Sequence, residues 1–321
     1  MTPRFLAAVT TAALCLSPAV ARGQADEDLW SPPRTAWGDP DLSGLWDFRT
    51  LTPLERPTEL EGKPVLTDEE AAEYEQETLR ELDKDRRTSD GLTAFEDVRN
   101  AYNQFWWDYG TKLTEDKRTS LIVDPPEGRV PALTPAAQKR ADTRTAALQR
   151  PAEGPEDRTP WERCIIGFNT GPPLNPSVYN NNFQLFQAPG TIAILIEMVH
   201  DARIVPLDGR AHLPSSIRQW RGDSRGRWEG DTLVVDTTHF TDKTSFRGSG
   251  PEMHLVERFT RVAPDTLLYE YTIDDPSFAR SWSAAIPMRK TDEPMYEYAC
   301  HEGNYGMFNL LQGARAQETS R

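Results

Sequence analysis

The sequence predicts a mainly β protein, an antiparallel barrel or sandwich with a helical segment inserted into it or packed on it. Residues 161–321 contain a series of short runs of strand-forming residues, most of them joined by tight Gly, Asp or Pro turns. The run 266–274 alternates apolar and polar residues, as a strand with one buried face does. Helix signals are confined to residues 65–150. About eight strands leave room for one small molecule, which favours a ligand-holding barrel.

Residues 1–25 have the pattern of a signal peptide. Arg4 supplies the positive start, residues 5–20 are almost free of polar groups, and Ala19-Val20-Ala21 or Gly23-Gln24-Ala25 offers a cleavage site. The apolar run is too short to span a membrane. We therefore expect a periplasmic or secreted protein with no integral membrane association.

Residues 26–160 form an N-terminal segment with one strand start, at Gly44, and two or three helices. Thr67 and Glu70 make a capping box that predicts a helix to about Lys84. Thr134 and Pro135 predict a second helix, which ends near Gln149. A third candidate, residues 94–108, carries more aromatic residues than solvent would favour: Phe95, Tyr102, Phe105, Trp106 and Trp107. Residues 119–123 predict a short strand.

Residues 161–321 form the antiparallel β domain, either separate or as one single domain with the preceding segment. Turn residues divide it into predicted strands. These strands are 182–187, 191–200, 203–207, 216–221, 225–228, 232–238, 255–262, 266–274, 284–289 and 296–300.

Composition and missing motifs exclude several functions. The chain has 321 residues, 37 % of them hydrophobic and 27 % charged, and a net charge of -14, which indicates a soluble globular protein. A surface this acidic repels phosphates, so we expect no nucleic-acid partner. The sequence lacks a Gly-x-Ser-x-Gly elbow, glycine-rich nucleotide loops and recognised metal-ligand spacings. We therefore expect no cofactor and no metal, the alternative being a metal held by histidines on separate strands, His200, His239 and His301.

The cysteines predict one disulfide. Removal of residues 1–25 would take away Cys15 and leave Cys164 and Cys300. In an oxidising compartment such a pair most simply forms a bridge. The alternative is a free nucleophilic cysteine, for which only the neighbouring His301 argues.

Three motifs resemble an uncharacterised family of secreted bacterial proteins. They are Gly44-Leu45-Trp46, the run 226–236 (GRWEGDTLVVD) and the run 300–305 (CHEGNY). The Gly-x-Trp start also resembles that of lipocalins, which bind small apolar molecules in a barrel. The resemblance implies export and a lipocalin-like fold.

Four residues are candidates for chemistry. Glu197 follows a run that is apolar on both strand faces, so we expect its carboxylate to be buried, where a raised pKa would suit a general acid or base. His200 or His301 would be its complement, and Arg203 would orient the substrate or stabilise an anion. The alternative is that Glu197 and Arg203 form a structural ion pair.

Aromatic and amide residues suggest a binding wall. Tyr179, Asn181, Trp107 and Trp220 would stack a ring and contact hydroxyl groups, although core packing and turn formation would explain them as well. Taken together, the sequence predicts a small-molecule-binding protein with cofactor-free lyase, hydratase or isomerase chemistry on an apolar, aromatic or glycosidic substrate. The alternatives are a non-catalytic carrier of a small hydrophobic ligand and a structural envelope protein.

Overall fold

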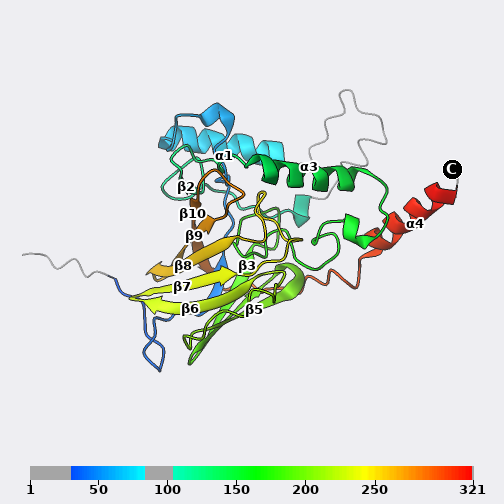
Figure 1. The fold of residues 1–321 in the computed structure, drawn as a ribbon. Coiled ribbons are helices and arrows are strands. Elements are labelled where there is room, and N and C mark those ends of the chain that lie inside the picture. The colour runs from blue at the N-terminus through cyan, green and yellow to red at the C-terminus, as the bar shows by residue number, and fades with distance from the viewer. Residues whose placement is uncertain (1–29, 84–103, 320–321) are drawn as a thin grey trace, which may run out of the picture. The chain divides into compact units, whose positions relative to one another are not determined.

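An antiparallel sheet of ten strands is the main element of the fold (Figure 1), which confirms the predicted mainly β class. The computed structural model describes residues 30–83 and 104–319, and those from Ser31 onward belong to one unit. The predicted signal peptide, residues 1–25, lies outside the described residues. So do residues 94–103 of the third candidate helix, of which the structure describes only the end, a 3-10 helix at Gln104–Trp106.

The strands follow the order β5-β4-β3-β1-β10-β9-β8-β7-β6, and β2 pairs with β10 off this path. Most neighbours in the sheet are also neighbours in the sequence. The exceptions are β1, which is inserted between β3 and β10, and β2, which pairs with β10. The bounds are β1 Gly44–Asp47, β2 Ile122–Asp124, β3 Asn182–Ala188, β4 Thr191–Ile196, β5 Asp201–Pro206, β6 Asp223–Glu229, β7 Thr232–Thr238, β8 His254–Ala263, β9 Thr266–Asp274 and β10 Trp282–Thr291.

The alternation in β9 is realised as predicted. Leu267, Tyr269, Tyr271 and Ile273 are all buried, and the residues between them are more exposed. Large side chains from several strands fill the inner side of the sheet in the same way. The largest fully buried ones include Trp46, Trp282, Phe183 and Phe259. The space that we expected to hold a ligand inside a barrel is therefore occupied by core side chains.

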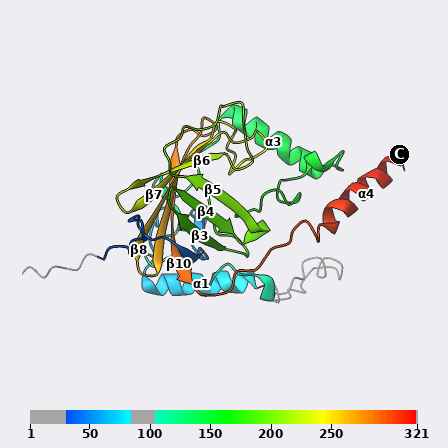
Figure 2. The ribbon, with the colours of Figure 1, turned by 90° about the horizontal axis from the view of Figure 1, so that it is seen from below.

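The two ends of the sheet meet without closing it (Figure 2). In the described part of the chain no ladder joins β5 to β6, although the two strands lie side by side. A Cβ atom at Gly226 would lie 2.9 Å from Val205 and 2.4 Å from Leu207, so glycine is needed for this close approach. An ion pair between Asp201 and Arg221 also connects the two edges. The result is an open barrel.

Three α-helices of the described residues lie outside the sheet: α1 Asp68–Leu82, α3 Pro135–Gln149 and α4 Tyr305–Thr319 (Figures 1 and 2). The predicted capping box of α1 is present, with Thr67 and Glu70 bonded reciprocally, and α3 begins at Pro135 as expected. Short 3-10 helices complete the elements: Thr58–Leu60, Pro155–Asp157 and Met198–His200. None of the helices in the described ranges is long and apolar enough to cross a membrane.

Several predicted strands were wrong or too long. Residues 216–221 contribute only an isolated bridge, Gln219 to Phe240, and residues 296–300 form no strand. The strand predicted over 191–200 ends at Ile196, after which the chain makes a 3-10 turn with Val199 at a φ of 62°. The strand predicted over 119–123 begins only at Ile122. Helix α4 was not predicted.

Candidate functional site

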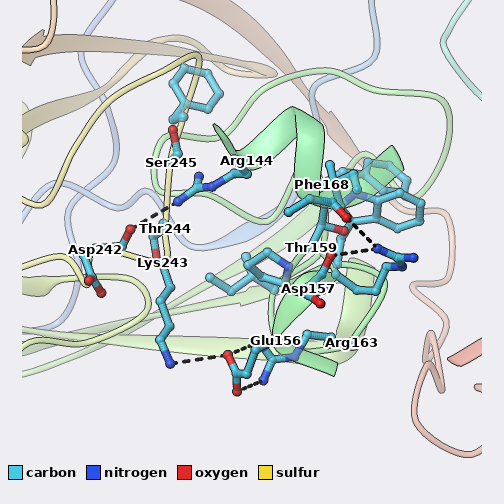
Figure 3. Close-up of a pocket in the computed structure, with 18 of the residues that line it drawn as sticks. Arg144, Glu156, Asp157, Thr159, Arg163, Phe168, Asp242, Lys243, Thr244 and Ser245 are labelled. Atoms are coloured by element: carbon cyan, nitrogen blue, oxygen red, sulfur yellow. Dashed lines mark hydrogen bonds and ion pairs between the residues drawn. The ribbon is translucent and has the colours of Figure 1, made fainter. Parts of the chain in front are cut away.

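A cavity of about 680 Å³ lies beside α3 (Figure 3). Three stretches of the chain form it: the last turns of α3 from Arg144 to Leu148, the loop 156–173, and the segment 242–246. Its volume falls in the range usual for small-molecule sites. We call it the α3 pocket.

Arg158 fixes the loop to the end of α3. This buried side chain donates through Nη1 to Ala147 O (3.3 Å) and through Nη2 to Arg150 O (3.0 Å). The last carbonyl groups of a helix lack partners within the helix, and a cation there also interacts favourably with the helix dipole. The loop and α3 are thereby held together as one wall of the pocket.

The apolar part of the wall presents aromatic surface to solvent. The exposed fractions of Trp161 and Phe168 are 51 % and 36 %, and their rings meet edge to face at 6.2 Å. Pro160, Pro172 and Leu148 extend this surface. Aromatic faces left open inside a concave site are suited to stacking on a flat apolar ligand.

Among the described residues, the exposed rim of the pocket includes one guanidinium, that of Arg144, that forms no ion pair, whereas the buried Arg158 is bound to backbone oxygens. Glu156 binds Arg163 (2.8 Å) and Lys243 (3.3 Å), and these bonds hold the pKa of Glu156 below its usual value. Arg144 donates only to a backbone oxygen, that of Asp242 (3.2 Å), and forms no ion pair with any residue that the structure describes (Figure 3). Partial burial lowers the pKa of Arg144; the charge of Asp242 opposes this shift, and Arg140 adds a smaller lowering. The rim thus offers a guanidinium to an anion.

Glu197 is buried, as expected, with 5 % of its surface exposed. Its carboxylate accepts hydrogen bonds from Asn182 Nδ2 (2.8 Å) and from Tyr296 N (3.3 Å). The alternative interpretation, an ion pair between Glu197 and Arg203, is wrong. Arg203 extends into the barrel and binds Glu257 through both terminal nitrogens, at 2.5 and 3.0 Å.

The two candidate histidines are exposed. His200 lies in the turn that follows Glu197, where its Nδ1 donates to Tyr298 O (3.2 Å). His301 lies in a turn before α4. The structure therefore brings Glu197 and His200 to the same segment, 296–298, while Arg203 points to a different partner in the core.

Of the predicted binding residues, Trp107 and Tyr179 meet edge to face at 6.2 Å. Tyr179 also contacts Phe168 of the α3 pocket, at 5.4 Å. Asn181 is fully buried and bonds backbone groups of Ser177 and Asp108, so it organises the loop before β3. Trp220 lies under the guanidinium of Arg163, 6.0 Å from it.

The predicted disulfide between Cys164 and Cys300 is confirmed. It joins residues 136 positions apart. Cys164 follows Arg163 of the pocket wall, and Cys300 precedes α4, so the bridge ties the C-terminal segment to this wall.

The sequence reasoning missed a cluster of histidine and aspartate residues on and beside β6, β7 and β8. Asp236 accepts from His212 Nε2 (2.9 Å) and His254 Nε2 (2.7 Å), and the other ring nitrogen of His212 faces Asp223 (3.0 Å). His239 meets the His212 ring edge to face at 5.9 Å. The residues come from distant segments, so their spacing gave no signal. No group of histidine, cysteine and acidic residues arranged to hold a metal ion is found within residues 30–83 and 104–319.

No protein-family model and no curated protein matches the chain. Solved structures of two point mutants of the fluorescent protein UnaG are similar at 15 % identity over 35 % of this chain and 72 % of theirs, each with a TM-score of 0.22. Because this TM-score is so low, the fold assignment rests on the strand order alone.

Proposed function

We propose that this protein binds a small organic acid with an aromatic body in the α3 pocket. The observation that carries the proposal is Arg144, a guanidinium that forms no ion pair with any described residue, in the same cavity as the open rings of Trp161 and Phe168. The rings would stack on the ligand and the guanidinium would take its acid group. In a chain with a net charge of -14, such a site selects its ligand by local contacts and not by the overall field.

The test uses 4-benzylbenzoate as the probe and calorimetry as the measurement. We expect saturable binding to the wild-type protein and a dissociation constant about tenfold higher for Arg144→Met, since about 1.4 kcal/mol corresponds to a factor of ten and a charged hydrogen bond contributes at least this much. Lys139→Met is the matched control, because Lys139 is exposed on the same helix and does not line the pocket. Equal affinity of the wild-type protein and Arg144→Met, or no saturable binding at all, would reject the proposal.

A second proposal retains the acid–base chemistry expected of Glu197, with His200 or His301 as its complement. Arg203, expected as an orienting group, is bound to Glu257 in the core and has no part in it. It is favoured by the buried carboxylate of Glu197 in the same turn as the exposed ring of His200. Incubation with small-molecule extracts, followed by untargeted mass spectrometry, should show a product that disappears with Glu197→Gln. If the wild-type protein and Glu197→Gln both retain one species and no new mass appears, the catalytic roles are rejected and the protein is a carrier.

We also propose that the protein is exported to the periplasm or secreted, in line with the resemblance to secreted bacterial proteins. The disulfide supports this proposal, because such bonds persist in oxidising compartments. The mass of the mature N-terminus in the periplasmic fraction tests it, with cleavage expected after Ala21 or Ala25.

A further inference from the structure

Two buried aromatic side chains next to the α3 pocket hold polar atoms that have no partner within residues 30–83 and 104–319. Tyr271 and Trp282 are 1 % and 0 % exposed, and their rings meet edge to face at 5.8 Å. Tyr271 Oη and Trp282 Nε1 make no hydrogen bond with any residue that the structure describes. Buried hydroxyl and indole groups are usually paired, so two unpaired ones in contact call for an explanation.

The neighbouring hydroxyl on the same strand face shows that this interior does pair its polar groups. Tyr269, two residues before Tyr271, donates to Glu257 Oε1 (2.8 Å) and accepts from Leu174 N (3.0 Å). Tyr271 has no such partner among the described residues, and burial raises the pKa of its hydroxyl, which therefore keeps its proton. Tyr271 and Trp282 together offer two donors.

Phe246 separates this pair of donors from the α3 pocket. It lines the pocket and is stacked on Trp282 (6.0 Å, 15° between the rings), while its edge meets Tyr271 (6.3 Å, 82°). The backbone amide of Phe246 donates to Ser249 Oγ (2.8 Å), which holds the chain at this position. The ring is only partly buried.

We propose that the ligand of the α3 pocket displaces the Phe246 ring and places a neutral oxygen acceptor on Tyr271 and Trp282. The inference rests on the function proposed above and narrows the ligand to an aromatic acid that also carries a carbonyl or similar oxygen. The acceptor at this end is neutral because the site lies in the apolar core, where an unpaired charge is strongly disfavoured. The acid group remains at the rim with Arg144.

A matched pair of probes tests the proposal. The compounds 4-benzoylbenzoate and 4-benzylbenzoate differ only in a carbonyl group that replaces a methylene group. We expect the ketone to bind the wild-type protein about tenfold more tightly by calorimetry. Tyr271→Phe should reduce this preference, since only the Trp282 donor remains, and should leave the affinity for 4-benzylbenzoate unchanged. It should not lower the melting temperature of the free protein, because the deleted hydroxyl has no partner among the described residues.

Tyr269→Phe is the control variant. It deletes a hydroxyl that has partners, so it should lower the melting temperature and keep the preference for the ketone. Irradiation of bound 4-benzoylbenzoate, whose ketone is photoreactive, should label peptides that contain Phe246, Tyr271 or Trp282. If both probes bind the wild-type protein with equal affinity and Arg144→Met weakens the binding of both, the α3 pocket is supported as the binding site. The acceptor site at Tyr271 and Trp282 is then rejected. If neither probe binds the wild-type protein, the function proposed for the α3 pocket is itself rejected.

Discussion

Arg203 on β5 and Glu257 on β8 form a bidentate ion pair inside the barrel, with distances of 2.5 and 3.0 Å. Glu257 is fully buried and Arg203 is 7 % exposed. Burial alone would lower the pKa of Arg203, but the carboxylate of Glu257 raises it, so the guanidinium stays charged. The pair links strands on opposite sides of the sheet order, and the hydroxyl of Tyr269 completes the bonding of the carboxylate.

Removing one member of this pair should destabilise the protein strongly. We expect Glu257→Gln to lower the free energy of unfolding by about 3–5 kcal/mol, because it leaves a buried guanidinium without its countercharge. The double variant Arg203→Met/Glu257→Met should lose less than the single one, since it buries no charge. Urea unfolding of the wild-type protein, the single variant and the double variant measures these free energies. A double variant less stable than Glu257→Gln would show that the pair itself contributes more than its desolvation costs.

Asp223 should make stability depend on pH. Burial would raise its pKa, but bonds from Leu213 N, His212 and Arg225 together hold the pKa below its usual value. A carboxyl with a depressed folded pKa contributes stability that is present above the unfolded pKa and is lost as the pH falls through the folded pKa. We expect Asp223→Asn to lower the free energy of unfolding by about 2–4 kcal/mol at pH 7, where charged hydrogen bonds are lost.

The difference between the wild-type protein and Asp223→Asn should shrink as the pH falls below about 4. Thermal unfolding measured between about pH 7 and pH 2.5 would follow it, with Asp142→Asn as an exposed control on α3. A difference that stays constant over this range would assign the effect of the substitution to packing instead of charge.

Local patterns in the sequence were sufficient for most of the strands and for two helices. The alternation in residues 266–274 determines which face is buried, and the capping box at Thr67 determines where α1 begins. Burial of Glu197 also followed from its apolar neighbours. Each of these features depends on residues within one element, which a single sequence displays.

Features that depend on contacts between elements were not visible in the sequence. Alternation along the strand predicts on which face of the sheet Arg203 lies. Its partner Glu257 is 54 residues away in the sequence and comes into contact with it only because the sheet curves. The α3 pocket is made from a proline-rich loop that gave no periodic signal, and residues 296–300 alternate like a strand but have no strand beside them in the described part of the chain. Helix α4 contains Gly306 and Gly313, which lowered its helical signal.

The loop wall of the α3 pocket should tolerate no side chain at Gly171. Its φ is 67°, and an added Cβ would lie 2.7 Å from Pro173 C and 2.9 Å from Leu174 N. Gly190 has a φ of 74° with nothing near its Cβ position. We expect Gly190→Ala to cost about 1 kcal/mol through backbone strain alone and Gly171→Ala to cost more, with weaker binding of 4-benzylbenzoate. Chemical unfolding and calorimetry test this comparison, and equal costs for the two variants would contradict it.

The disulfide should stabilise both the fold and the pocket wall. A bridge that closes a loop of this size contributes about 4–5 kcal/mol on the chain-entropy model, because it restricts the unfolded chain. We expect the double variant Cys164→Ser/Cys300→Ser to unfold at a lower urea concentration and to bind 4-benzylbenzoate less tightly, since Cys164 lies within the loop that carries Trp161 and Phe168. Thiol titration of the denatured, unreduced wild-type protein should find neither cysteine reactive. If the double variant loses stability but binds the probe with unchanged affinity, the bridge acts on the unfolded chain alone, and the hydrogen bonds of Arg158 are enough to hold the wall.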